Sequence, residues 1–166
     1  MKKINIEGKH NIDKIEGRKP QRANVDYKEP GIKYQPILIN KYYLNELNNL
    51  NEKKYIETEL KKKLNSYKQQ DCKKQIHDNN TIISFDQTIE KLVISKLKCY
   101  YCKKKMKVLF QLSRDPSQWT LERLNNNINH TNNNTVISCL ACNLERRVKN
   151  SDAFHFTKNL SITHIE

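Results

Sequence analysis

Four cysteines in this chain form two pairs whose spacing suits a metal site. The pairs are Cys99-Tyr-Tyr-Cys102 and Cys139-Leu-Ala-Cys142, with 36 residues between them. Each C-x-x-C turn can direct two thiolates at one ion, so two such turns supply the four ligands of a tetrahedral structural zinc. The alternative is a set of disulfides, which secreted proteins favour. No apolar run follows the first five residues, so we expect no signal peptide and predict a zinc site in an intracellular protein.

A fifth cysteine, Cys72, stands apart from these pairs. It lies between Asp71 and Lys73 in a polar stretch and has no second cysteine at ligand spacing. We therefore expect a free thiol that is exposed or partly buried.

Basic residues clearly outnumber acidic ones. The chain has 31 Lys and Arg against 18 Asp and Glu, for a net charge of +13. Such an excess favours a polyanionic partner, and DNA is the expected one, with RNA left open. An anionic membrane surface is the competitor, but the sequence has no apolar run of about 18 residues and no basic helix with a strong apolar face. No membrane partner is expected.

Turn signals and apolar spacing indicate the elements that precede the first cysteine pair. All three glycines and three of the four prolines fall within residues 1–36, which we interpret as a disordered basic arm. From Asn40 to Gln70, apolar residues recur every three or four positions without Gly or Pro, which predicts one long helix or two short ones. A polar break is expected at 71–80. Ser84-Phe85-Asp86-Gln87 has the form of a capping box that opens a helix ending near Lys96.

Between the cysteine pairs, the pattern predicts a β-hairpin and then a loop. Residues 107–112 and 118–124 are strand-like and flank a turn at 114–117. Residues 125–134 include seven Asn, which tolerate left-handed backbone, so a compact loop is expected there. A short extended piece at 135–138 should lead into a helix from the second pair to Lys149. A last apolar segment is expected at 152–160.

These elements predict an α+β fold, namely a small treble-clef or ββα-metal zinc finger preceded by helices and the basic arm. The predicted organisation is an arm at 1–36, a helical region at 37–84, a zinc-stabilised domain at 85–160 and a tail at 161–166. Zinc would replace the apolar core that about 60 residues could not build alone.

The residues around the second pair carry several motifs together. They are Trp119-Thr-Leu-Glu-Arg-Leu-Asn-Asn, then His130-Thr131, an Asn five residues before Cys139, and an Asn directly after Cys142. With the paired cysteines, residues 99–149 resemble the HNH, or His-Me finger, endonucleases, and look closest to the zinc-bound subgroup of recombination endonuclease VII and of phage and large-virus HNH proteins. The resemblance covers under a third of the chain. It implies hydrolysis of DNA phosphodiester bonds with one catalytic Mg²⁺ or Mn²⁺, in a host cytoplasm or nucleus if the chain is viral.

The resemblance also implies roles for single residues. Glu122 takes the place of the first acidic ligand of the catalytic ion, and Asn143 takes the place of the last ligand. Asn134 takes the place of the Asn that braces the loop. The family's usual Asp-His step reads Glu122-Arg123 here, so the base is absent from its usual place. His130, further along the loop, is then the candidate base, and Arg123 is a candidate phosphate donor.

Each of these residues also has a purely structural interpretation. His130 would brace the loop, and Glu122 would be a surface carboxylate paired with a cation. Asn143 would cap a helix, and Arg123 would be a charged strand residue.

Basic residues are concentrated in the same segment. Residues 99–150 contain nine Lys or Arg and three Asp or Glu. The expected phosphate contacts are Lys103, Lys104, Lys105, Arg146, Arg147 and Lys149.

Three functions compete at this point. The first is an HNH-type metal-dependent endonuclease. The second is a catalytically inactive, zinc-stabilised nucleic-acid-binding module. The third is a protein-interaction zinc finger that uses the long helix as a docking surface. Binding to DNA that weakens steeply with salt would separate the first two from the third, and magnesium-dependent cleavage would separate the first from the second.

Overall fold

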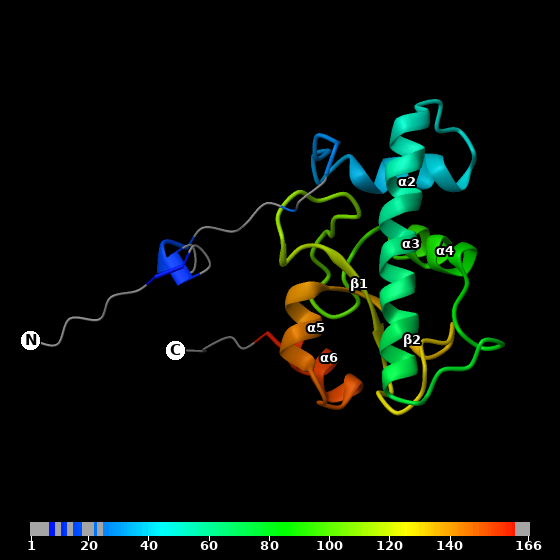
Figure 1. Ribbon diagram of the computed structural model, residues 1–166. Coiled ribbons are helices and arrows are strands. Elements are labelled where there is room, and N and C mark those ends of the chain that lie inside the picture. The colour runs from blue at the N-terminus through cyan, green and yellow to red at the C-terminus, as the bar shows by residue number, and fades with distance from the viewer. Residues whose placement is uncertain (1–6, 9–10, 13–14, 18–21, 23–24, 162–166) are drawn as a thin grey trace, which may run out of the picture.

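The structure of the protein is a computed structural model, and it describes residues 7–8, 11–12, 15–17, 22 and 25–161. This part of the chain has the predicted α+β character, with helices around a small two-stranded sheet (Figure 1). The elements in chain order are α2 (Gln35–Tyr43), α3 (Leu50–Lys73), α4 (Phe85–Ile94), β1 (Trp119–Arg123), β2 (Thr135–Cys139), α5 (Leu140–Arg146) and α6 (Ser151–Asn159).

The sheet pairs β1 with β2 in antiparallel register. Trp119 lies opposite Cys139, and Arg123 lies opposite Thr135. All five residues of β1 are buried. The strand is covered by α5, which packs on both strands, and by α3, whose Tyr67 hydroxyl accepts a 2.9 Å hydrogen bond from the backbone N–H of Leu121. Two helices that are far apart in the sequence therefore both contact the sheet.

This pairing corrects the predicted hairpin. Residues 107–112 are not a strand, and within the described chain Lys107 contributes an isolated bridge to Gln118. The backbone N–H groups of Val108 and Leu109 instead donate to the side-chain oxygen of Gln35, at 2.6 and 3.0 Å. A buried glutamine from another part of the chain has replaced the expected partner strand. The short extended piece expected at 135–138 is the true partner of β1.

The predicted range from Asn40 to Gln70 is largely helical, but it holds the end of α2, which begins at Gln35 within the predicted arm, and the long α3 rather than one long helix or two short ones. The Asn49 side chain caps α3 by accepting from the N–H groups of Asn51 and Glu52, which satisfies donors that have no partner inside the helix. α3 then runs for 24 residues and continues into the expected polar break as far as Lys73. In Figure 1 its last turns reach the loop between β1 and β2.

The capping box is confirmed at the start of α4. Ser84 and Gln87 exchange the two expected hydrogen bonds, and α4 ends at Ile94, two residues before the predicted end. The helix after the second cysteine pair ends at Arg146 rather than Lys149. Arg147 has φ +52°, a left-handed conformation that stops an α-helix.

The expected disordered arm is wrong for its last part. Tyr27 and Gln35 are buried, and the guanidinium of Arg22 donates to the carbonyl of Phe110 at 3.0 Å and to Glu59 at 2.8 Å. Because these contacts bury polar groups with their partners, residues 25–36 belong to the folded structure. The arm prediction for 1–6, 9–10, 13–14, 18–21 and 23–24, and the tail prediction for 162–166, lie outside the described residues.

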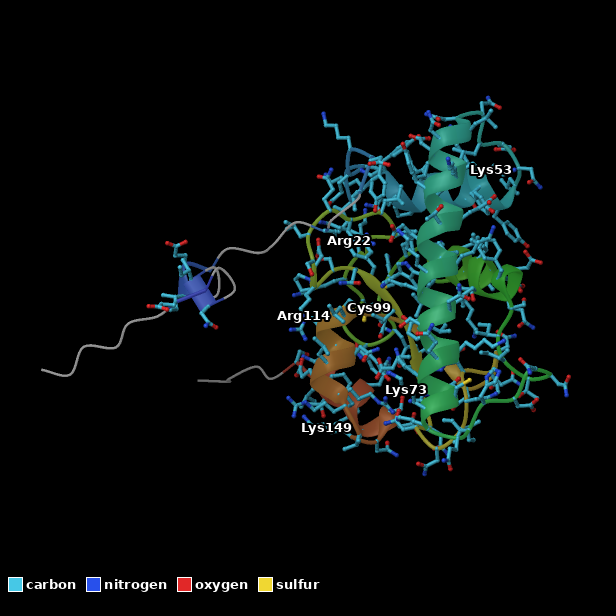
Figure 2. The ribbon with its side chains drawn as sticks, viewed as in Figure 1. Arg22, Lys53, Lys73, Cys99, Arg114 and Lys149 are labelled. Carbon is cyan, nitrogen blue, oxygen red and sulfur yellow. The ribbon has the colours of Figure 1, made fainter. Side chains whose placement is uncertain are left out.

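One hydrophobic core connects the predicted helical region with the predicted zinc domain. Leu38 and Leu60 belong to the same buried cluster as Leu92, Trp119 and Leu121. Charged side chains surround this core, and Figure 2 shows Lys53 and Lys73 near the two ends of α3. None of the helices in the described part combines the length and the apolar character that crossing a bilayer requires.

Candidate functional site

The four predicted cysteines converge. Their sulfur atoms all lie within 4.8 Å of one another, and all but the half-buried Cys102 are buried. The sulfurs of Cys102 and Cys139 are 3.8 Å apart. That matches the separation of about 3.8 Å between ligands placed tetrahedrally at about 2.3 Å from zinc. Backbone N–H groups of Cys139 and Cys142 donate to sulfur atoms of the group, at 3.3 and 3.5 Å.

The chemistry of these thiols also suits a cation. Hydrogen bonds, first from Cys139 and then from backbone amides, lower the pKa of Cys99 to about 4. Burial and then the negative charge of Cys99 raise the pKa of Cys142 to about 12. Four thiols this close together cannot all ionise alone, whereas a bound divalent cation removes that restriction. The group therefore suits a structural metal ion such as zinc. Cys72 is exposed and lies outside it.

A polar cleft of about 400 Å³ lies along β1, between α3 and α5. α3 supplies four residues at positions i, i+3, i+4 and i+7, which form one face of a helix. The cleft is lined by Lys63, Ser66, Tyr67 and Gln70 of α3, Gln118, Thr120, Leu121, Glu122 and Arg123 of the β1 segment, Asn126 and His130 of the loop, and Leu140, Asn143, Arg146 and Arg147 of the α5 segment. Six predicted site residues are therefore brought together: Glu122, Arg123, His130, Asn143, Arg146 and Arg147.

Glu122 is buried and well satisfied. Its Oε1 accepts a 2.7 Å hydrogen bond from Nη1 of Arg146, and its Oε2 accepts a 2.8 Å bond from the hydroxyl of Ser138. Burial raises the pKa of Glu122, and these two donors oppose that shift. Glu122 is thus paired with a cation, Arg146, as its purely structural interpretation predicts. The pair is buried, however, whereas that interpretation placed the carboxylate on the surface.

Asn143 is connected to Glu122 through two hydroxyl groups. Its Nδ2 donates to Oγ1 of Thr120 at 3.1 Å, and Thr120 and Ser138 share a 2.9 Å hydrogen bond. Ser138 in turn donates to Glu122. Because the amide nitrogen is held in this way, the oxygen Oδ1 is left to accept, and it has no hydrogen-bond donor among the described residues. An amide oxygen is a ligand that hard cations such as Mg²⁺ accept.

His130 is held by two residues of α3. Its Nδ1 lies 2.8 Å from both carboxylate oxygens of Asp71, and its backbone N–H donates to the same carboxylate at 2.9 Å. Its ring packs against Tyr67 at a centroid distance of 4.8 Å. Burial lowers the pKa of His130 below 6.5, and Asp71 opposes this shift. The imidazole is therefore neutral at pH 7, the form that can accept a proton.

Sequence reasoning missed Asp71, which fell in the expected polar break. It is fully buried and also accepts a 3.1 Å hydrogen bond from Nη1 of Arg123. A signal for it exists in the sequence, because Asp71 continues at helical spacing the buried face that carries Ile56, Leu60 and Tyr67.

Asn134 makes the loop-bracing contacts that the resemblance implies. Its Nδ2 lies within hydrogen-bond distance of the carbonyls of Asn125, Ile128 and Asn129, at 2.9 to 3.2 Å. Its Oδ1 accepts from the backbone N–H of Asn125 at 2.9 Å. Asn134 shapes the loop that carries His130 and does not itself line the cleft.

The predicted phosphate contacts divide into two groups. The prediction that Arg146 contacts phosphate is corrected, because its side chain is buried and donates to Glu122 and to the carbonyl of Leu124, both at 2.7 Å. Arg147 is exposed and lines the cleft. Lys149 is exposed beside α6, where Figure 2 shows it. Lys103, Lys104 and Lys105 are exposed near the first cysteine pair but are not among the residues that line the cleft.

Lys63 is a cation of the cleft that sequence reasoning did not select. Its ammonium group donates to the side chain of Gln118 at 3.0 Å and to the carbonyl of Trp119. It also lies 5.0 Å from the centre of the Trp119 ring. Burial lowers the pKa of Lys63 to about 7. It therefore joins α3 to β1 at one end of the cleft.

Comparison with known proteins finds no matching protein family, no similar curated protein and no similar solved structure.

Proposed function

We propose that the protein is an HNH-type, metal-dependent endonuclease that hydrolyses DNA phosphodiester bonds on a treble-clef finger with a structural zinc. The observation that carries this proposal is that Glu122, His130 and Asn143 line one cleft although they come from a strand, a loop and a helix. The cleft lies directly beside the cysteine group, because Asn143 follows Cys142 in the chain.

Glu122 and Asn143 are the residues that would hold the catalytic ion. When bound there, Mg²⁺ or Mn²⁺ would stabilise the negative charge that develops on the phosphate and the leaving oxygen. Oδ1 of Asn143 is free of donors within the described chain, and each oxygen of Glu122 has a lone pair beyond the one used by Arg146 or Ser138. The hydroxyls of Thr120 and Ser138 hold the two ligands in a fixed relation.

His130 supplies the base. With Nδ1 bound to Asp71, the ring nitrogen Nε2 is the one that can take a proton from a water molecule attacking phosphorus. Its lowered pKa keeps the ring neutral at pH 7, so it is ready to accept that proton. Arg147, exposed at the edge of the cleft, supports the proposal as a donor to the phosphate backbone.

One observation favours the second function, a catalytically inactive nucleic-acid-binding module. The carboxylate of Glu122 is neutralised by Arg146 at 2.7 Å, and both side chains are buried. A cation at Glu122 would lie close to that guanidinium, which opposes its binding. A nucleic-acid-binding module without catalysis needs no metal at Glu122, so the buried pair of Glu122 and Arg146 is compatible with it.

Cleavage assays on supercoiled, linear and branched DNA, with Mg²⁺, with Mn²⁺ and with a chelator, separate the two functions. We expect metal-dependent cleavage by the wild type, strong loss in Asn143→Ala, and little change in the matched control Asn133→Ala, which alters an exposed loop residue. Salt-sensitive DNA binding without cleavage of any substrate would instead support the binding module.

A further inference from the structure

α3 lies outside the segment that resembles the HNH endonucleases, yet it contributes the described polar contacts to the ring of His130. Asp71 approaches Nδ1 at 2.8 Å, and Tyr67, one helical turn earlier, packs on the ring at 4.8 Å. Residues four apart on a helix lie on the same face. Two consecutive turns of α3 therefore fix the ring, one by a hydrogen bond to Nδ1 and the other by packing against the ring.

The groups around Asp71 offset the cost of burying its carboxylate beside His130. A carboxylate buried without partners is costly, because it loses the solvation of its charge. Asp71 accepts hydrogen bonds from the backbone N–H of His130 at 2.9 Å and from Arg123 at 3.1 Å, which offset that loss. Arg123 occupies the position where the family has its histidine base. Here Arg123 instead supplies the counter-charge for Asp71, the carboxylate partner of a base placed seven residues later.

We propose that Asp71 is the positioning residue of the catalytic base. It accepts the hydrogen bond from the Nδ1–H of His130, fixes that tautomer, and leaves the lone pair of Nε2 for the proton of the attacking water. This inference rests on the proposed nuclease function and deepens it. The catalytic unit then consists of the finger together with the last turns of α3, and the finger alone is incomplete.

The charges that face His130 determine how this role appears in a pH profile. They are Asp71 of α3, Lys74 directly after α3, and Arg123 of β1, with the neutral Tyr67 against the ring. Asp71 raises the pKa of His130, whereas Arg123 and Lys74 lower it. A base acts in its neutral form, so activity is lost as the pH falls through its pKa. Removing the charge of Asp71 must therefore move the acidic limb of the profile to lower pH.

The test compares full-length wild type with Asp71→Asn. The amide carries no charge and replaces one acceptor oxygen with an NH2 donor, so it cannot accept from Arg123 and from both N–H groups of His130 as the carboxylate does. We expect kcat to fall by about 100-fold, with KM nearly unchanged and the acidic limb of kcat/KM at lower pH. The matched control, Asp86→Asn, alters an exposed carboxylate in the first turn of α4 and should leave rate and profile unchanged. A lower rate with an unmoved limb would overturn the proposal.

Nitrogen NMR of the imidazole gives a second readout that does not need cleavage or a folded variant. In the wild type, the proton of neutral His130 should reside on Nδ1, and an Nε2–H tautomer would overturn the proposal. If wild type and Asp71→Asn cleave DNA equally fast, Asp71 has no role in positioning the base, whereas the proposed nuclease function still holds. A wild type that cleaves no DNA would overturn the nuclease and, with it, the catalytic role of Asp71, even if the Nδ1–H tautomer is found.

Discussion

Glu122 on β1 and Arg146 on α5 form a buried ion pair, with 2.7 Å between Oε1 and Nη1. Arg146 also donates to the carbonyl of Leu124, so its guanidinium fastens α5 to the end of β1. The pair thus belongs both to the stability of the sheet and to the floor of the cleft. Removing either side chain of this ion pair should therefore lower the stability of the fold.

Arg146→Ala should lower the free energy of unfolding by about 3 kcal/mol, because it leaves Glu122 buried without its counter-charge. The matched control is the neighbouring Arg147→Ala, which alters an exposed residue and should change stability by less than about 0.5 kcal/mol. Urea unfolding of both variants measures the difference. Equal stability of the two variants would show that the ion pair contributes nothing.

The cysteine group should bind one zinc per chain. Cys102→Ser should lose the metal and destabilise the fold, because the ion would join the first cysteine pair to the end of β2 and the start of α5. Cys72→Ser, the matched control, should keep both metal and fold, since Cys72 lies outside the group. Elemental analysis and circular dichroism of the three proteins provide the measurement. Folded wild type with less than about half an equivalent of zinc would contradict the assignment.

Lys63 should contribute to the pH dependence of the free energy of unfolding. Its pKa is about 7 in the folded protein and near 10.5 in the unfolded chain, so between these values the unfolded state binds more protons. Stability therefore gains from this group as the pH rises above 7, by at most about 1.4 kcal/mol per pH unit. The gain should vanish in Lys63→Met, when urea unfolding is compared from pH 7 to 9. Parallel curves for the two proteins would mean that Lys63 stays protonated in the fold.

Local sequence rules predicted those parts of the fold whose interactions are local. The capping box of α4 needs only Ser84 and Gln87, three residues apart, and each C-x-x-C turn positions its own two thiols. The predicted hairpin failed because the backbone of 108–109 pairs with Gln35, more than 70 residues earlier. No pattern within 107–124 carries that information.

The same distinction applies to the cleft. Glu122, Asn143 and His130 were found from a motif that keeps its spacing along the chain. Asp71 was missed because its role depends on how α3 packs across β1, and its sequence neighbours are polar. Arg146 was assigned to phosphate for its charge, whereas its burial assigns it to Glu122.

The most direct test of the proposed nuclease mechanism is cleavage of DNA by His130→Ala, compared with wild type and with His77→Ala, which alters a histidine outside the cleft. In the presence of Mg²⁺ or Mn²⁺, we predict that His130→Ala cleaves about 100-fold more slowly than wild type. DNA affinity should stay nearly unchanged, and His77→Ala should retain full activity. Equal cleavage rates for His130→Ala and wild type would contradict the proposed mechanism, because His130 would then play no part in the reaction.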